Sequence, residues 1–214
     1  MARFSRFITL LVLFFATPAM AQLKIDITKG HMNPLPIAIT DLTGAGNYGA
    51  DIARVINANL ERSGLFRPIE KRAFIETITN GDSVPRFADW RQINAQALVT
   101  GTISEVGGNK LKVSFRLWDT QIEKQVAGKE FNTFTRNWRR IAHLMSDEIY
   151  KRLTGEDGYF DTRVVYVSET GPARARIKRL AIMDQDSENH KCLTNGQDLV
   201  LTPRFSPSTQ EILY

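Results

Sequence analysis

TRNWRRIAHLMSDEIYKRLTG, EDG and YFDTRVVYVSE follow one another from Thr135 to Glu169, and this stretch decides the fold. In its first part, apolar residues recur at steps of three and four, which predicts an amphipathic helix with one buried face. These residues are Trp138, Ile141, Ala142, Met145, Ile149 and Leu153. We expect Thr135 to be the N-cap and Gly155 to end the helix, while Lys151 and Arg152 suit the negative end of its dipole.

The polar spacer Glu156-Asp157-Gly158 marks a change in the pattern. After it the hydrophobic period falls from 3.6 to 2, and only strand-like segments follow. We therefore predict a domain boundary, with an α+β domain over 35–157 and an incomplete β-propeller over 158–214. The first domain is expected to have two main helices on one side of a small mixed sheet.

Alternation and turn residues predict the individual elements. In the first domain we expect strands at 35–42, 65–70, 97–106, 110–119 and 125–134, a helix from about 48 to 62, and helical turns at 74–78 and 87–93. In the second we expect strands at 162–167, 179–183, 190–193, 199–205 and 211–214.

A short internal repeat in the sequence suggests a β-propeller in the second domain. The segment 160–166 resembles 205–214, and Tyr166 and Tyr214 lie 48 positions apart, which is about the length of one blade. Because a propeller closes with about four to eight blades, we expect this chain to hold roughly one blade and to be truncated.

The first 21 residues read as a signal peptide. Arg3 and Arg6 form a positive start, an apolar run follows, and the small residues around Ala21 suit cleavage between Ala21 and Gln22. We therefore expect a periplasmic protein. Loss of two arginines lowers the net charge from +5 to +3, a mild excess that gives no reason to expect nucleic-acid binding.

The start of the mature chain alternates between apolar and polar residues. Leu23, Ile25 and Ile27 share one face, and the polar segment 29–34 follows as a tether. One interpretation is an ordinary edge strand of the first domain. The other is a strand that pairs with the open sheet edge of another protein, where backbone bonds give affinity and alternate side chains give selectivity.

A second motif, Gly44-Ala45-Gly46-Asn47-Tyr48-Gly49, matches the dinucleotide fingerprint GxGxxG between a strand and a helix, with Glu70 as the acidic residue. A cofactor would place its phosphate at the helix N-terminus. Against this, Asp41 puts a carboxylate beside the glycine turn, and the later strands look hairpin-joined. The alternative is that the glycines serve only the loop and the helix entry.

Signs of catalysis or metal binding are weak. His31, His143 and His190 are scattered, and we expect His143 to be a packed helix residue rather than a base. The run after Asp184 resembles a calcium loop but lacks the required glycine and the final chelating glutamate, so a hairpin tip is expected. Cys192 is the only cysteine, which excludes an internal disulfide. We assign no catalytic, cofactor or metal residues.

The motifs SDEIYKRLTG at 146–155, FDTRVVYVSE at 160–169, and LAIMDQD and LTPRFSPS further on resemble the TolB family, the periplasmic propeller proteins of the Tol-Pal envelope system. The resemblance implies a monomer that reaches membranes only through its partners. Its propeller would bind the lipoprotein Pal, on loops that this chain mostly lacks. Its mature N-terminus would bind inner-membrane TolA. The segment concerned is Gln22, Leu23, Lys24, Ile25, Asp26, Ile27, Thr28, Lys29, Gly30, His31, Met32 and Asn33.

The resemblance further implies a non-catalytic role in outer-membrane integrity and in envelope constriction during cell division. An alternative from another class is the propeller lid of a secreted serine peptidase, because such lids carry similar blade repeats. The sequence beyond the propeller distinguishes the two, since a peptidase would show a nucleophile elbow there.

Overall fold

The computed structural model describes Leu23 and residues 33–214. Its strands and helices run in the order β1 (Leu35–Ile39), β2 (Thr43–Gly44), α2 (Tyr48–Arg62), β3 (Phe66–Pro68), α3 (Phe87–Gln92), β4 (Ala97–Glu105), β5 (Lys110–Asp119), β6 (Lys124–Phe134), α4 (Trp138–Thr154), β7 (Arg163–Thr170), β8 (Ile177–Asp184), β9 (Lys191–Cys192), β10 (Arg204–Phe205) and β11 (Ile212–Leu213). The predicted signal peptide and the predicted strand at 22–28 lie outside the described residues, apart from Leu23.

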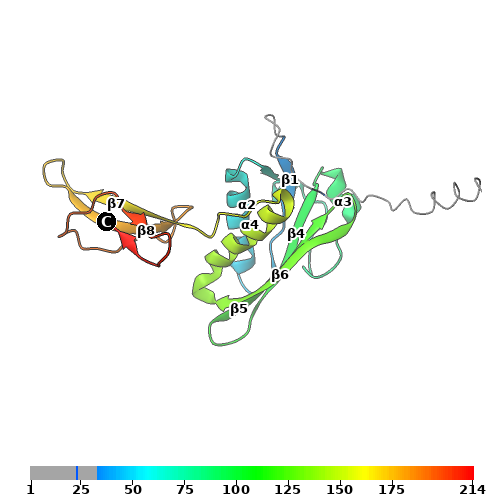
Figure 1. Cartoon of the computed structure of the whole chain (residues 1–214). Coiled ribbons are helices and arrows are strands. Elements are labelled where there is room, and N and C mark those ends of the chain that lie inside the picture. Colours follow the sequence, from blue (N-terminus) through cyan, green and yellow to red (C-terminus); the bar gives the residue numbers. More distant parts are fainter. Residues whose placement is uncertain (1–22, 24–32) are drawn as a thin grey trace, which may run out of the picture.

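The first part of the chain forms a mixed sheet in the order β3-β1-β4-β5-β6, with β2 paired to β4. Strand β1 is parallel to β3 and β4, whereas β4, β5 and β6 run antiparallel through tight connections. Helices α2 and α4 lie together on one face of this sheet (Figure 1). The predicted architecture of two main helices on a small mixed sheet is confirmed.

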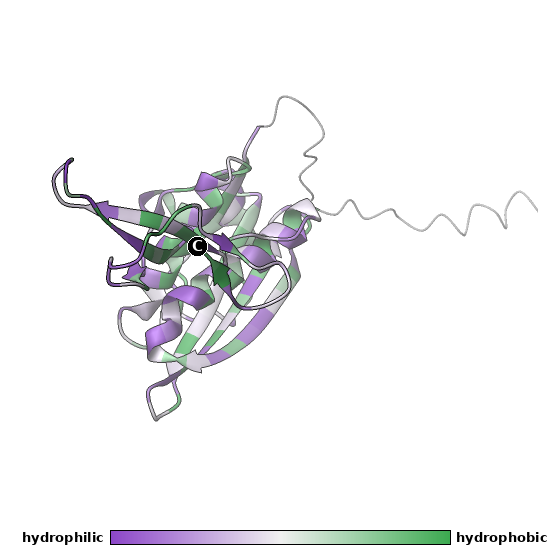
Figure 2. Cartoon of the chain, turned by 60° about the vertical axis from the view of Figure 1, so that its left-hand side comes forward, coloured by the Kyte–Doolittle hydropathy of each residue, from purple (hydrophilic) through white to green (hydrophobic). Residues whose placement is uncertain are grey.

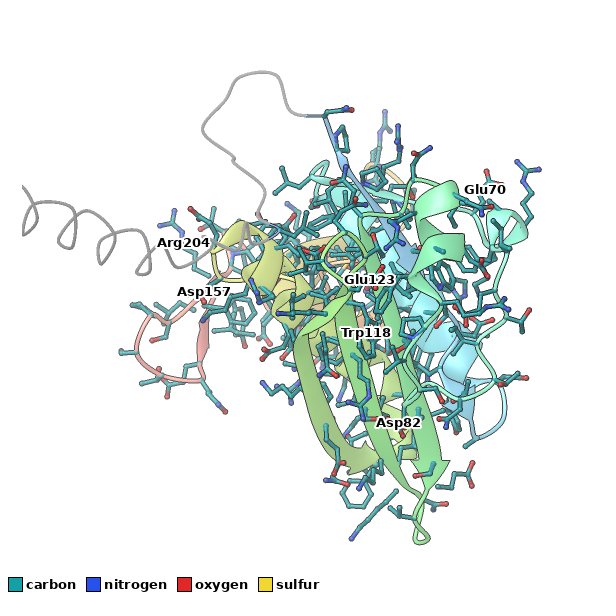
Figure 3. The ribbon with its side chains drawn as sticks, turned by 90° about the vertical axis from the view of Figure 1, so that its right-hand side faces the viewer. Glu70, Asp82, Trp118, Glu123, Asp157 and Arg204 are labelled. Atoms are coloured by element: carbon teal, nitrogen blue, oxygen red, sulfur yellow. The ribbon has the colours of Figure 1, made fainter. Side chains whose placement is uncertain are left out.

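The core divides between the two faces of the sheet. On the helix side, Ile37, Val99 and Phe115 pack with the apolar stripes of α2 and α4. On the other side, Leu98 and Trp118 pack with the short helix α3 and Ala38; Trp118 is labelled in Figure 3. Successive residues of a strand point to opposite faces, so β1 and the start of β4 are apolar throughout. Strand β5 instead alternates between polar and apolar residues from Lys110 to Leu117, and Figure 2 shows hydrophilic and hydrophobic colours together on the long strands of this sheet.

The glycine motif between β1 and α2 has a structural explanation. Gly44 has φ 125°, and a Cβ atom there would lie 1.9 Å from the carbonyl oxygen of Ile103. At Gly49 a Cβ atom would lie 2.0 Å from the carbonyl oxygen of Leu42. Both positions therefore need glycine because another backbone segment passes against them. Asp41 forms an ion pair with Lys71 beside this loop.

Two local predictions in the first domain were wrong. Thr135 is not the N-cap of α4, because a 3-10 turn occupies Thr135–Asn137 and the helix begins at Trp138 after Asn137. No helical turn forms at 74–78; a 3-10 turn lies earlier, at Lys71–Ala73. Phe74 instead packs edge-on against Trp90, with ring centroids 5.0 Å apart, so contact with the core overrides the local helical tendency. The predicted helix end is confirmed, since Gly155 has φ 87°.

The remaining strands are of the propeller type. Strands β7, β8 and β9 form an antiparallel three-stranded sheet, and β10 pairs with β11. The strands predicted at 199–205 and 211–214 are present but shorter, because only Arg204–Phe205 and Ile212–Leu213 pair. Several apolar side chains remain exposed here, including Leu199 at 73% and Leu213 at 69%.

Candidate functional site: the junction of α4 with the β7–β8 hairpin

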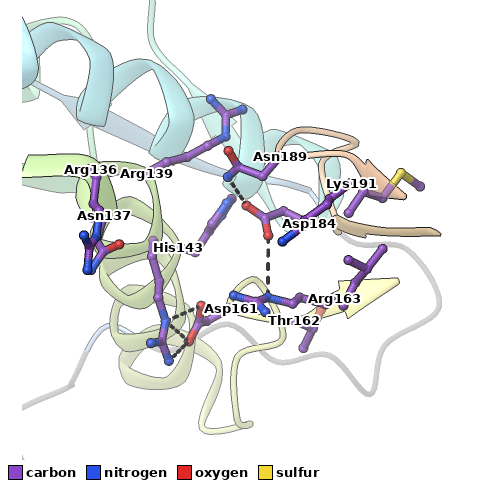
Figure 4. A pocket seen from close by; sticks show the side chains of 13 residues that line it. Arg136, Asn137, Arg139, His143, Asp161, Thr162, Arg163, Asp184, Asn189 and Lys191 are labelled. Atoms are coloured by element: carbon purple, nitrogen blue, oxygen red, sulfur yellow. Dashed lines mark hydrogen bonds and ion pairs between the residues drawn. The ribbon is translucent and has the colours of Figure 1, made fainter. Parts of the chain in front are cut away.

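A pocket of about 330 Å³ lies where the start of α4 meets β7, β8 and the segment before β7 (Figure 4). Its lining brings together five basic side chains and two carboxylates. The basic residues are Arg136, Arg139, Arg140, Arg163 and Lys191; the acidic ones are Asp161 and Asp184. The pocket is therefore a strongly charged junction between elements far apart in sequence.

Asn59 of α2 is the polar centre beneath this junction. Its side chain is fully buried. Its amide nitrogen donates to His143 Nδ1 and to Ser146 Oγ, both at 3.0 Å. Its amide oxygen accepts from Arg62 at 2.7 Å and from Gln185 at 3.1 Å. These partners fix the orientation of the amide, because a reversed amide would turn its nitrogen toward two donors. One residue thus links α2, α4 and the turn after β8.

The contacts of His143 define its tautomer. Since Nδ1 accepts a hydrogen bond from Asn59, the proton of the neutral ring resides on Nε2. The side chain is 2% exposed, and Nε2 is a buried polar atom with no hydrogen-bond partner. Burial lowers the pKa of His143 below its ordinary value despite the attraction of Asp186 and Asp184. The expectation of a packed histidine is confirmed.

Asp186, in the turn after β8, forms the main ion pair of the junction. Arg139 donates to its Oδ2 from Nη2 at 2.6 Å and from Nε at 3.1 Å. The Nε2 atom of His143 lies 3.6 Å from the same oxygen. Burial raises the pKa of Asp186, but the hydrogen bonds and charge of Arg139 outweigh this, so the pKa falls below its usual range. The carboxylate therefore stays charged while it joins the two parts of the chain.

A second carboxylate fixes the segment that connects α4 to β7. Asp147 accepts the backbone N–H groups of Phe160 at 2.7 Å and of Asp161 at 3.1 Å. Gly158 passes so close that a Cβ atom would lie 2.3 Å from the Asp147 carboxylate. Burial raises the pKa of Asp147, although these hydrogen bonds act in the opposite direction. Arg140 then holds the Asp161 side chain with contacts of 3.0 and 3.1 Å.

One constellation here resembles a metal site. His143, Asp184 and Asp186 place possible ligand atoms within 4.8 Å of one another. However, Arg139 already neutralises Asp186, and Asn189 donates to Asp184 at 2.6 Å. A histidine that binds metal through one nitrogen normally donates from the other, whereas Nδ1 here accepts a hydrogen bond. The cluster is better explained as an ion-pair junction than as a metal centre.

The predicted partner-binding segment falls mostly outside the described residues. Within 22–33, the structure describes only Leu23 and Asn33. Leu23 is partly buried and packs against the helix-side core, whereas Asn33 is exposed. The predicted cleavage site at Ala21 and Gln22 lies outside the described residues. Cys192 is exposed and has no disulfide partner in the described part of the chain.

The junction was not predicted from the sequence. Its one sequence signal is the placement of Arg139, His143 and Ser146 along α4, where such spacing puts polar residues near an otherwise apolar face. Asn59 and Gln185, which complete the site, are 126 positions apart. Whether these two side chains come into contact depends on how α2 packs against α4, and no local sequence pattern predicts that packing.

The described residues contain no helix that is both long enough and apolar enough to span a membrane.

Comparisons with known proteins match both parts of the chain to one family. A family model described as the TolB amino-terminal domain matches residues 23–126, and one described as the TolB beta propeller domain matches residues 150–214. A crystal structure of TolB from Acinetobacter baumannii is 27% identical, with a TM-score of 0.70 over 89% of this chain. This chain spans 46% of the length of that TolB.

Two other solved structures are more distant. A lipoprotein GNA1162 from Neisseria meningitidis is 17% identical, with a TM-score of 0.39, and the match covers 47% of this chain and 81% of that one. A PelC dodecamer from Paraburkholderia phytofirmans is 15% identical, with a TM-score of 0.38, covering 60% and 96%. Neither likeness is close enough to indicate a shared function. The two domain matches and the TolB structure agree with each other, and the chain belongs to the TolB family.

Proposed function

We propose that this chain is a non-catalytic periplasmic interaction component of the Tol-Pal system, which binds TolA through Gln22–Asn33. The single observation that carries this proposal is the match of both TolB domain models in their expected order. The alternation of Leu23, Ile25 and Ile27 supports the assignment, because a strand with one apolar face can add to an open sheet edge. In the wider system, these residues together with a complete propeller would link TolA to outer-membrane Pal and so support envelope integrity and constriction during division.

The binding of Pal is assigned to the propeller. The described part of the sequence has five propeller-type strands, β7 to β11, so a polypeptide of residues 22–214 offers only a part of the surface expected to contact Pal. We therefore expect the chain to bind TolA but not Pal. Pull-downs with each purified partner test this, and Pal retained by this chain would move the Pal site onto the first domain or the first blade.

The decisive experiment replaces the apolar face of the segment while leaving its polar face alone. The double variant Ile25→Ser and Ile27→Ser removes two apolar anchors, and we expect TolA affinity to fall by at least about 100-fold, since burying each large aliphatic side chain contributes about 1.5–3 kcal/mol. The matched control is Lys24→Ser with Thr28→Ser on the opposite face, for which a change of less than about threefold is expected. Calorimetric titration with the TolA domain measures both.

Equal losses in the two double variants would contradict pairing through one apolar face. The melting temperature provides a second check, because a segment used for a partner contributes little to the fold. Deletion of 22–33 should abolish TolA binding and leave the melting temperature of the domain nearly unchanged, whereas a large fall in melting temperature would assign the segment a structural role.

The predicted start of the mature chain has its own test. Sequencing of the exported protein from its N-terminus checks whether it begins at Gln22, as export to the periplasm predicts.

A further inference from the structure

His143 is a buried ionisable residue that plays no part in the proposed function. Its side chain is 2% exposed and lies between α2 and the turn after β8, because Asn59 contacts one ring nitrogen and Asp186 faces the other. In the neutral ring, Nδ1 accepts the Asn59 amide at 3.0 Å, and Nε2 carries the proton. Nε2 lies 3.6 Å from Asp186 Oδ2, which is too far for a hydrogen bond. Among the described residues, the ring is therefore held by a single hydrogen bond, at Nδ1.

Protonation would reverse the role of Nδ1. An imidazolium donates from both ring nitrogens, so a charged His143 would direct an N–H group at the amide nitrogen of Asn59, which is itself a donor. Because both side chains are buried, the two donors would face each other without water to accept from them. The contact is restored when Asn59 turns its amide over and presents its oxygen to Nδ1.

The amide of Asn59 cannot serve both forms of the ring. With the neutral ring, its oxygen accepts from Arg62 at 2.7 Å and from Gln185 at 3.1 Å. Its nitrogen also donates to Ser146 Oγ at 3.0 Å. Turned over, the amide would direct its nitrogen at the donors of Arg62 and Gln185. Arg62 is exposed and can turn into solvent. Gln185 is the residue through which Asn59 holds the turn after β8, so the turned amide releases that turn.

Charged groups on the elements around His143 act on its ring. The charged form is favoured by carboxylates from α4, from the segment before β7, and from β8 and the turn after it: Asp147, Asp161, Asp184 and Asp186. Arg139 of the same helix opposes it. Glu188 lies 3.8 Å from that arginine, and on α2 Arg62 donates to the Asn59 amide oxygen. Burial outweighs the attractions and lowers the pKa of His143 below its ordinary value of 6.5. The ring is therefore neutral at neutral pH and takes up its proton only in acid.

We propose that His143 makes the junction sensitive to acid: protonation of its ring turns over the Asn59 amide and releases Gln185. The two orientations of this amide are the two states, and the proton selects between them. The ion pair between Arg139 and Asp186 persists in both, so in acid the two parts of the chain stay attached while the turn after β8 loosens. The switch lies outside the segment proposed to bind TolA and does not depend on that binding.

Nuclear magnetic resonance follows the three side chains directly. The chain is labelled with ¹⁵N and titrated from pH 7.5 to pH 5.0. We expect the ring of His143 and the side-chain NH2 groups of Asn59 and Gln185 to change with one common midpoint, below 6.5. A ring that stays neutral at pH 5.0, or amide signals that change with a different midpoint, would overturn the proposal.

Hydrogen exchange reports the release of the turn. The backbone N–H of Gln185 donates to the Thr162 carbonyl oxygen at 3.2 Å, and its protection falls when the turn opens. After correction for the intrinsic rate, the protection factor of this amide should be at least about threefold lower at pH 5.0 than at pH 7.5, with changes of less than about 1.5-fold in β4 and β5. An equal fall across the chain would indicate global destabilisation by acid and would rule out a local switch.

The variant His143→Asn places an amide oxygen close to the position of Nδ1 but takes up no proton. It should keep the Asn59 contact and show no fall in the protection of Gln185 in acid. The matched control, His190→Gln, removes the exposed histidine that follows the same turn and should keep the full response. A response that survives in His143→Asn, or is lost in His190→Gln, would refute the assignment to His143.

Gln185→Met is the second variant, because His143→Asn leaves a space beside the core and circular dichroism has to show whether it folds. Removing the Gln185 amide breaks the link at every pH without changing the buried ring. Protection of the backbone N–H of residue 185 should already be low at pH 7.5 and should change less than about 1.5-fold in acid. If it falls as in the parent chain, the proton does not act through Gln185, and the proposal is wrong.

Discussion

At the scale of single residues, Asn59 joins more of the molecule than any local pattern suggests. Its amide uses its nitrogen for His143 and Ser146 and its oxygen for Arg62 and Gln185. From the sequence, Asn59 is only a polar residue in the α2 helix. Helical periodicity predicts the face on which it lies, but a buried amide is recognised only when its partners are known.

Replacing Asn59 with alanine should destabilise the chain by about 2–4 kcal/mol, because it leaves the buried Nδ1 of His143 and the partly buried amide of Gln185 without this partner. Urea unfolding at neutral pH measures the change. Asn57→Ala in the same helix is the matched control. It removes one partly buried bond to the Ala53 carbonyl oxygen, and a loss of less than about 1 kcal/mol is expected. Equal losses for both variants would refute the central role of Asn59.

The ionisation of His143 makes stability depend on pH. Its folded-state pKa is lowered by burial, so below the ordinary value of 6.5 the unfolded chain binds the proton more readily. Stability from this group is therefore complete above that value and is lost as the pH falls toward the folded-state pKa. We expect the urea midpoint to fall between pH 7.5 and pH 5.5, and to fall less in His143→Gln.

Asp147 contributes with the opposite sign, because burial raises its pKa. For that group, stability is present below its ordinary pKa of 3.8 and is lost as the pH rises through the folded-state value.

The His143 prediction has a clear contradicting outcome. If the urea midpoint falls as steeply with pH in His143→Gln as in the parent chain, another group dominates the acid response.

At the scale of elements, the sequence predicted best where one periodicity runs uninterrupted. The bounds of α2 and of β5 are those expected, because each carries its apolar residues on one face, with Trp118 at the end of β5 as the exception. Prediction failed where a contact with distant residues decides the outcome. Phe74 turns toward Trp90, and Thr135 enters a 3-10 turn before α4, so neither serves the local helix expected of it.

The glycine loop between β1 and α2 gives a test at this scale. Gly49→Ala should destabilise the fold by about 2–4 kcal/mol, since the new Cβ meets the Leu42 carbonyl oxygen and the backbone must shift. In the same motif, Gly46 has φ 51°, but no atom lies within 4 Å of the place that an added methyl group would take. Gly46→Ala should therefore cost only about 1–2 kcal/mol, from the left-handed backbone alone. Thermal melts compare the two.

The opposite ranking would show that the close approach at Gly49 does not explain the motif. A titration with a fluorescent nicotinamide cofactor separately tests the nucleotide interpretation, and saturable binding would revive it.

At the scale of the whole molecule, the junction ties the first domain to the propeller-type strands. The sequence predicted both parts and their order, and it placed the change of pattern at Glu156-Asp157-Gly158. The structure has α4 ending at Thr154 and β7 beginning at Arg163. The division between 157 and 158 stays a prediction. The contacts between the parts could not be predicted, because they join helix residues to a turn that is distant in sequence, 47 positions after Arg139 and 126 after Asn59.

Arg139 and Asp186 test this connection, because their side chains are 17% and 7% exposed. Removing either partner leaves a largely buried charge, so the free energy of unfolding should fall by about 3–5 kcal/mol. The loss is smaller if water reaches and solvates the remaining charge. A double-mutant cycle with Arg139→Met and Asp186→Leu should give a coupling energy of about 1–3 kcal/mol. The exposed pair Lys178–Glu169 within the hairpin is the control, and its coupling energy should be less than about 1 kcal/mol.

Hydrogen exchange of the amides in β7 and β8 supplies the spatial readout. Loss of the Arg139 pair should raise exchange in these strands more than in β4 and β5. Uniform exchange across the chain would show that the two parts unfold as one unit and that the pair does not act as their connection.

The grip of Asp147 on two consecutive amides has a mechanical consequence. Phe160 and Asp161 are held to the side of α4, so the link between the helix and β7 cannot pivot freely. A pull on the strands would therefore load both of these hydrogen bonds at the side of the helix. Separating β7 from α4 would require the loss of both bonds as well as the exposure of Phe160, which is fully buried.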